Sequence, residues 1–322
     1  MNRTIYPFRT IISFLLVLFT MPLGHALMIL MEHTMSDTVL HYSAFLMGAV
    51  GFLLAVVGVF VKGDTRQTLF GLFGSLLFWT GWVEFLFAYY AQRYGVHCDL
   101  VGDGVVQTTT TYVGGIGVSH EFLINGTPLA DYSRAVLKSI RGSRPEYLIM
   151  PSSFGFFMMF ALVYVFSVRT GCSAINWCQK QLFRGKRDIV VVRPMTRHVS
   201  IVTFMELTTM MWFSYLLLMF CYDPVFLGDS HPLTLLLALL CAVGSVFMFR
   251  RELRLQGWGA NIRMAIATVI VFWTAVEVIA RNRLVSEIWL DPMGHIVEMS
   301  SLLAAFVLLL AYLFLRVVKR GK

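Results

Sequence analysis

Residues 10–31, TIISFLLVLFTMPLGHALMILM, form an apolar run that is long enough to cross a lipid bilayer. About 20 apolar residues in a helix span the hydrocarbon core. The run contains His25 and leads directly into Glu32 and His33. An imidazole inside lipid is costly to bury unless something binds it. The run therefore sets the fold and also indicates where polar chemistry gathers.

The composition of the whole chain agrees with this reading of the first run. Hydrophobic residues make up 57% of the 322 residues and charged residues only 14%, and the mean hydropathy is +0.72. A chain with so few polar groups cannot cover a globule in water. The composition excludes an ordinary soluble protein and predicts an all-α integral membrane protein whose main partner is the lipid bilayer.

Apolar runs of spanning length occur about eight times along the chain. They lie at residues 10–31, 43–61, 68–91, 149–168, 200–221, 232–249, 263–281 and 297–316. We predict a bundle of about eight transmembrane helices, with helices one to three in residues 1–91 and helices four to eight in residues 149–322. Glycines in the second run, Gly48, Gly51 and Gly58, favour close packing against neighbouring helices.

The basic residues predict the orientation of the bundle. Basic loops stay on the cytoplasmic side, and with the N-terminus inside, 19 of the 26 Lys and Arg residues fall on the inner side, many in the loop 169–199. The other seven are Arg93, Arg134, Lys138, Arg141, Arg144, Arg281 and Arg283. We therefore expect a protein of the bacterial inner membrane with both termini in the cytoplasm. The net charge of +8 reflects this topology, and no nucleic-acid partner is expected.

The N-terminal residues 1–26 also fit a second interpretation. A basic start, an apolar run and the small residues around His25 resemble a cleaved signal peptide. The apolar run continues to Met31, however, which favours an uncleaved membrane span. Cleavage would leave seven spans in the same orientation, so the charge distribution does not decide between the two.

Residues 92–148 form the one sizeable segment outside the membrane, on the outer, periplasmic side. Residues 105–113 and 118–124 alternate in the manner of strands around the turn 114–117, which predicts a β-hairpin. Thr127 and Pro128 have the pattern of a helix start, so a short helix is expected to about residue 140. This α+β insertion is a candidate contact for other membrane or periplasmic subunits.

Histidines and carboxylates gather on the outer side of the predicted bundle. Seven of the eight histidines lie there, and only His198 lies on the inner side. Charge bias does not explain this, because neutral imidazole carries no topological penalty. Imidazole and carboxylate groups on facing helices are the usual way in which bundles hold metal ions. The candidate ligands are His25, Glu32, His33, Glu84, Glu277, His295 and Glu298.

A mixed imidazole and carboxylate set suits zinc, iron or copper(II), and nearby methionines favour copper(I). No nucleotide cofactor is expected, because no P-loop or dinucleotide motif occurs. A structural alternative stands beside the metal site: His25 and Glu84 form a hydrogen-bonded pair without metal, His295 and Glu298 cap the eighth span, and the methionines only pack.

The sequence thus favours a membrane subunit that binds a transition metal or takes part in redox chemistry. If the protein is an enzyme, a metal-dependent membrane oxidoreductase is expected, although no catalytic residue is identified. Two other functions stay open. One is a scaffold or assembly subunit without catalysis, and the other is a proton-coupled transporter.

Overall fold

The computed structural model describes four stretches of the chain, namely residues 5–86, 198–222, 231–282 and 284–315. It also describes Tyr89, Ser153 and Leu227, and the backbone of five short strands between residues 100 and 142.

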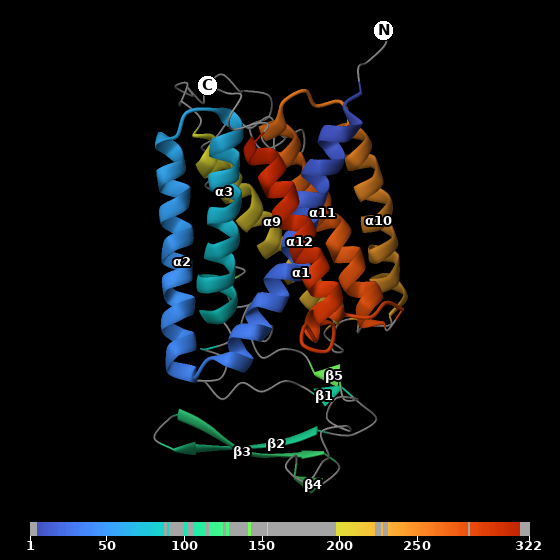
Figure 1. Cartoon of the computed structure of the whole chain (residues 1–322). Helices are drawn as coiled ribbons and strands as arrows, with labels where there is room; N and C mark the ends of the chain where they lie inside the picture. The colour runs from blue at the N-terminus through green and yellow to red at the C-terminus, as the bar shows by residue number, and fades with distance from the viewer. Residues whose placement is uncertain are drawn as a thin grey trace, which may run out of the picture.

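In this described part, seven long helices run side by side in one bundle (Figure 1). They are α1 (Pro7–Thr34), α2 (Asp37–Phe60), α3 (Asp64–Phe78), α9 (Val199–Tyr222), α10 (Pro232–Glu252), α11 (Trp258–Arg281) and α12 (Ile296–Leu313). α1 begins and α12 ends at the same end of the bundle (Figure 1). We call this end the inner end, after the orientation expected from the sequence, and the opposite end the outer end.

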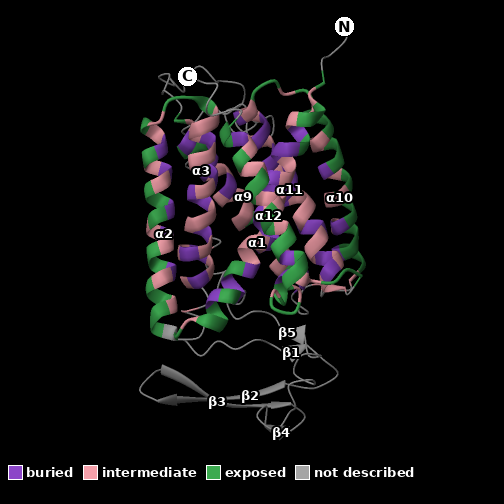
Figure 2. Cartoon of the chain, in the orientation of Figure 1, coloured by how far each residue is buried: buried purple, intermediate pink, exposed green. Residues whose placement is uncertain are grey.

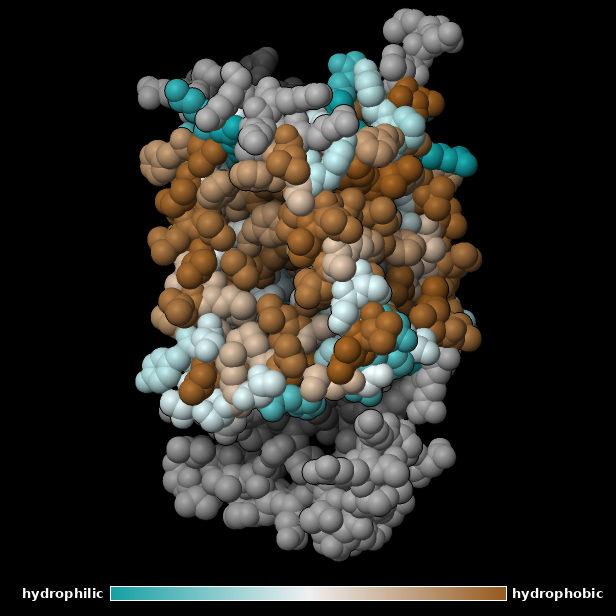
Figure 3. All heavy atoms as spheres, in the orientation of Figure 1, coloured by the Kyte–Doolittle hydropathy of each residue, from teal (hydrophilic) through white to brown (hydrophobic). Residues whose placement is uncertain are grey.

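Six of these helices are long and apolar enough to cross a membrane, namely α1, α2, α9, α10, α11 and α12. Apolar side chains form a broad band around the visible face of the bundle, and hydrophilic side chains lie above and below it (Figure 3). This arrangement is that of a polytopic membrane protein, whose apolar surface matches the hydrocarbon core. The expected membrane location and helical fold class are therefore confirmed at this level.

The predicted third span differs from a simple α-helix. α3 has only 15 residues, and the chain then continues as the π-helical segment η1 (Trp79–Glu84). α3 alone is therefore shorter than the six helices of spanning length. The predicted span at 149–168 lies outside the described residues except for Ser153. The count of eight spans thus stays a prediction.

The glycines of α2 pack as the sequence predicts. A Cβ atom added to Gly48 would meet the Trp82 ring, and one added to Gly58 would meet the Ser200 side chain. At Gly51 it would meet the backbone nitrogen of Phe78. Small residues let helix backbones approach closely, which is a main source of helix association in membranes.

The core lies along α1 and α11, where much of each helix is buried (Figure 2). Leu16 and Val17 of α1 and Ile262, Ile266 and Val269 of α11 are fully buried in one apolar cluster. α2, α10 and α12 expose far more of their length to the surroundings. A polar side chain on the inward face of α1 or α11 is therefore held by the best-packed part of the bundle.

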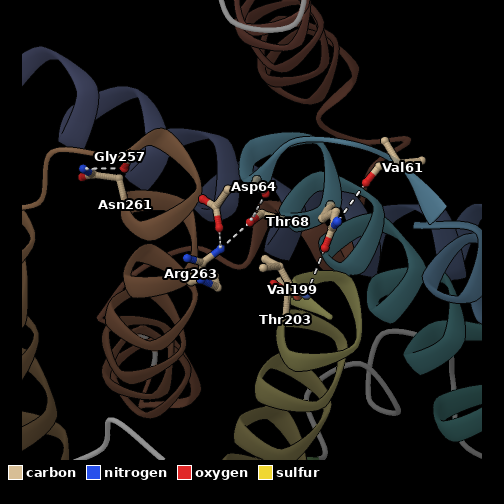
Figure 4. A network of polar contacts seen from close by, with 9 residues as sticks. Val61, Asp64, Thr68, Val199, Thr203, Gly257, Asn261 and Arg263 are labelled. Atoms are coloured by element: carbon tan, nitrogen blue, oxygen red, sulfur yellow. Dashed lines mark hydrogen bonds and ion pairs between the residues drawn. The ribbon is translucent and has the colours of Figure 1, made fainter. Parts of the chain in front are cut away.

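Direct hydrogen bonds tie the helices together at the inner end (Figure 4). Arg263 Nη1 of α11 donates to Asp64 Oδ1 at 3.0 Å and to Thr68 Oγ1 at 2.6 Å, both on α3. Thr10 Oγ1 of α1 donates to Asn261 Oδ1 at 2.9 Å. These contacts have ordinary hydrogen-bond lengths. They join the first turns of α1 and α3 to those of α11.

The outer insertion contains the β-hairpin that the sequence suggests, but it differs from the prediction at the expected helix start. Strands β2 (Val106–Val113) and β3 (Ile116–Ile124) pair antiparallel. Thr127–Pro128, predicted to begin a helix, instead forms strand β4 and pairs with Leu123 and Ile124. Antiparallel pairing with β3 makes these two residues extend the sheet. β1 (Leu100–Val101) pairs with β5 (Arg141–Gly142). The rest of the predicted helix lies outside the described residues, so the α+β insertion as a whole is still a prediction.

Candidate functional site

A histidine and a glutamate from facing helices meet in the outer half of the bundle. His25 Nε2 of α1 lies 3.7 Å from Glu277 Oε1 of α11. Their side chains are 16% and 22% exposed, so both groups are mostly withdrawn from the surroundings. Since much of α1 and of α11 is buried in the core of the bundle, this pair is positioned by its two most buried spanning helices.

Trp273 holds both members of the pair. Its indole Nε1 donates to Glu277 Oε1 at 2.8 Å from one turn earlier on α11. Its ring stacks on the His25 ring with an interplanar angle of 20° and a centroid distance of 6.4 Å. Trp289, in the short helix η5 (Ile288–Leu290), packs against Trp273 in turn. The carboxylate and the imidazole are thus oriented by one aromatic side chain.

A cavity opens beside the pair, between α1, α9 and α11, and we call it the outer cavity. Its lining includes His25, Glu277, Trp273, Ser214, Tyr215 and Tyr222, and the thioethers of Met21, Met211 and Met219. The cavity has a volume of about 30 Å³. One water needs roughly 10–15 Å³ by this measure. The outer cavity therefore has room for an ion and a water molecule, but not for a large organic ligand.

Polar side chains continue along the wall of the outer cavity. Ser214 Oγ of α9 and Thr274 Oγ1 of α11 share a hydrogen bond of 2.7 Å. Thr274 Oγ1 also donates to the carbonyl oxygen of Ile270, which lines the same cavity. Hydroxyl groups of this kind hold facing membrane helices together and keep a polar surface beside the ion-sized space.

Glu84 has a different partner from the one that the sequence suggests. It lies at the end of η1, where Tyr215 Oη donates to Glu84 Oε1 at 2.7 Å. Tyr215 is also part of the outer cavity, so Glu84 is linked to the cavity through a phenol. The pairing of Glu84 with His25 is replaced by two separate pairs, His25 with Glu277 and Glu84 with Tyr215.

The remaining predicted ligands lie at the outer rim of the bundle. His295 Nδ1 is 3.7 Å from Glu298 Oε1, and these side chains are 39% and 55% exposed. The expected capping by His295 is not seen, because its side chain makes no cap hydrogen bond to α12. Glu32 and His33 are exposed at the end of α1. None of these four residues lines the outer cavity.

The predicted ligands are therefore brought together only in pairs. In the part of the chain that the structure describes, no three His, Cys, Asp or Glu side chains gather closely enough to hold a metal ion. The convergence of four helices on one point, as expected from the sequence, is not seen among these residues. The arrangement that most resembles a metal site is the pair His25 and Glu277, which lines the outer cavity together with three methionines.

Several residues of the outer cavity were missed by the sequence analysis. Met21, Met211 and Met219 belong to a chain with 18 methionines, so no single one is conspicuous. Tyr215 lies in the middle of an apolar helix and carries no motif. The one available signal was the spacing of Trp273 and Glu277, since residues four apart share a helix face.

Comparisons with known proteins give no family for this chain. No protein-family model matches it, and neither a curated protein nor a solved structure shows significant similarity to it.

Proposed function

We propose that the protein is an integral membrane protein that binds one transition metal ion in the outer cavity, and that this metal is copper. His25 and Glu277 are the principal ligands. The observation that carries the proposal is their separation of 3.7 Å at the wall of an ion-sized cavity.

The separation itself favours a shared ion over a direct contact. A nitrogen–oxygen hydrogen bond is about 2.7–3.2 Å long, shorter than the observed 3.7 Å. Two ligands of one tetrahedral ion, each about 2.0–2.2 Å from the metal, are about 3.4 Å apart. A shift of a few tenths of an ångström therefore brings His25 and Glu277 to the spacing that a bound ion needs.

The neighbouring side chains favour copper over zinc. Imidazole binds both metals, but thioether sulfur is a soft ligand that selects copper(I). Met21, Met211 and Met219 all line the outer cavity. Trp273 donates to the Glu277 carboxylate, as ligating carboxylates generally receive a hydrogen bond from a residue outside the metal's own shell.

The proposal includes the topology in its finer form. Helical structure is continuous from Asp64 to Leu86, a length of roughly 30 Å that is enough to cross the bilayer. With this span and one at 149–168, the chain crosses eight times with both termini in the cytoplasm. The outer cavity then faces the periplasmic side of an inner membrane, where the insertion 92–148 is available to partner subunits.

The proposal is tested by measuring the metal content of protein purified without chelators. Wild-type protein is expected to carry about one copper ion per chain, and His25→Ala is expected to lose it. His295→Ala serves as the control, because His295 belongs to the other His–Glu pair at the same end. Absence of stoichiometric metal in wild-type protein, or an equal content in His25→Ala, contradicts the proposal.

Proton-coupled transport is the second candidate function. It is favoured by the chain of polar side chains at the cavity, in which Ser214 bonds Thr274 and Tyr215 bonds Glu84. In that case Glu277 exchanges protons and holds no metal. Uptake in vesicles that depends on a pH gradient and is lost in Glu277→Gln would support transport, whereas stoichiometric copper would favour the first proposal.

A further inference from the structure

Tyr215 and Glu84 connect the outer cavity to a different part of the bundle. Tyr215 lines the cavity from α9, and its hydroxyl donates to Glu84 Oε1 over 2.7 Å. Both side chains are only partly buried. A phenol that donates a hydrogen bond to a carboxylate can pass its proton to that carboxylate while its oxygen accepts another.

The position of Glu84 follows from the π-helical segment η1. Segments of this kind are rare and occur often at functional sites, because the extra residue turns the following side chains to a new direction. Gly81 lies against α2 so closely that an added Cβ would meet the carbonyl oxygen of Ala44. Trp82 Nε1 donates to the carbonyl oxygen of Phe45 on the same helix. With Trp82 fixed toward α2, Glu84 points toward α9 and reaches Tyr215.

Aromatic and apolar side chains flank this pair. Trp79 is 2% exposed and packs on Tyr215 with ring centroids 5.5 Å apart. From α2 and the end of α1, the neighbours of Phe85 beside Glu84 are apolar, namely Ala44, Met28 and Met31. Among the described residues, His25, Glu277 and Tyr222 line the cavity together with Tyr215. Arg281 lies over the Tyr222 ring, and His41 of α2 packs against Tyr89.

We propose that Tyr215 and Glu84 carry protons between the outer cavity and the outer end of the bundle. A water molecule in the cavity relays a proton from protonated His25 to the Tyr215 oxygen while the phenol's own proton passes to Glu84 Oε1. Glu84 then releases the proton to water at the outer end. The reverse sequence carries a proton from that water to neutral His25, and the water and the phenol are unchanged after each passage. The inference concerns the same cavity as the proposed metal site, but it does not depend on a metal being bound.

The test follows the arrival of protons at His25 in metal-free protein. Protonation of the imidazole changes the fluorescence of the indole that stacks on it, here Trp273. A stopped-flow jump from roughly pH 8 to pH 5 covers the range in which imidazole ordinarily titrates. The signal is assigned by its loss in Trp273→Phe. Its rate is then compared between wild-type protein and variants in nanodiscs.

We expect the rate to fall by about tenfold or more in Tyr215→Phe and in Glu84→Gln, with an unchanged final amplitude. Glu84→Gln keeps an oxygen that accepts the Tyr215 hydrogen bond, so it removes proton transfer and leaves the contact. Glu298→Gln, at an exposed carboxylate of the same end, is expected to keep the wild-type rate. Wild-type rates in both Tyr215→Phe and Glu84→Gln would overturn the inference, whatever the metal content of the protein.

Discussion

Two His–Glu pairs lie at the outer end of the bundle, and each has a nitrogen–oxygen distance of 3.7 Å. His25 and Glu277 come from two core helices, are mostly buried and adjoin a cavity. His295 and Glu298 are three residues apart on one helix and are largely exposed. The same chemical pair at the same distance thus occurs in two environments. Water screens and solvates the exposed pair, whereas the buried pair is mostly withdrawn from water, where a charged group is costlier to hold.

After removal of a ligand itself, loss of the Trp273 hydrogen bond to Glu277 is expected to have the largest effect on copper binding. Trp273→Phe keeps the ring stacked on His25 but removes the donor to Glu277. We expect copper(I) affinity to fall by about 10–100-fold, as for other residues that orient metal ligands. Competition titration with a copper(I) chelator measures this change.

Trp289→Phe is the matched control for that titration. Trp289 packs against Trp273 with ring centroids 4.9 Å apart, but it leaves the hydrogen bond to Glu277 in place. Its copper(I) affinity is expected to stay within about threefold of wild type. Equal affinities in Trp273→Phe and Trp289→Phe would show that the indole donor does not hold the site.

The free energy of unfolding gives a smaller contrast between the two pairs. In metal-free protein, Glu277→Ala removes the acceptor of the Trp273 N–H in a mostly buried place. We expect a loss of about 1–2 kcal/mol, measured by unfolding in mixed detergent micelles. Glu298→Ala, at an exposed carboxylate, is expected to change stability by about 0.5 kcal/mol or less.

A second substitution separates the hydrogen bond from the charge. Glu277→Gln retains an amide oxygen that accepts the Trp273 N–H, so it should recover most of the stability lost in Glu277→Ala. If Glu277→Gln is as destabilised as Glu277→Ala, the carboxylate charge and not the hydrogen bond stabilises the metal-free protein.

Hydropathy predicted most of the fold because lipid leaves few alternatives to long apolar helices. It found the helices α1, α2, α9, α10, α11 and α12, with ends that lie within six residues of those observed. It did not find the π-helical segment at Trp79–Glu84, since hydropathy alone does not separate π-helical from α-helical turns. Nor did it predict β4, because Thr127–Pro128 has the local pattern of a helix start and its strand pairing comes from β3.

The candidate site could be predicted only in part. His25 and Glu277 stood out because ionisable groups inside the membrane usually face the bundle interior. Their pairing with each other, and that of Glu84 with Tyr215, depends on which helices touch and how each is rotated. The sequence pattern does not contain that information. Glu32 lies seven residues after His25 on the same side of α1, yet its side chain is exposed, whereas the adjacent Met31 is buried.

X-ray absorption at the copper edge tests the central claim most directly. Wild-type protein loaded with one equivalent of copper(I) is expected to show nitrogen or oxygen neighbours together with sulfur, from imidazole, carboxylate and thioether ligands. The imidazole signature should vanish in the double variant His25→Ala with Glu277→Ala. It should persist in His295→Ala with Glu298→Ala, the other pair at 3.7 Å. An unchanged spectrum in the first variant, or a loss only in the second, would contradict a metal site in the outer cavity.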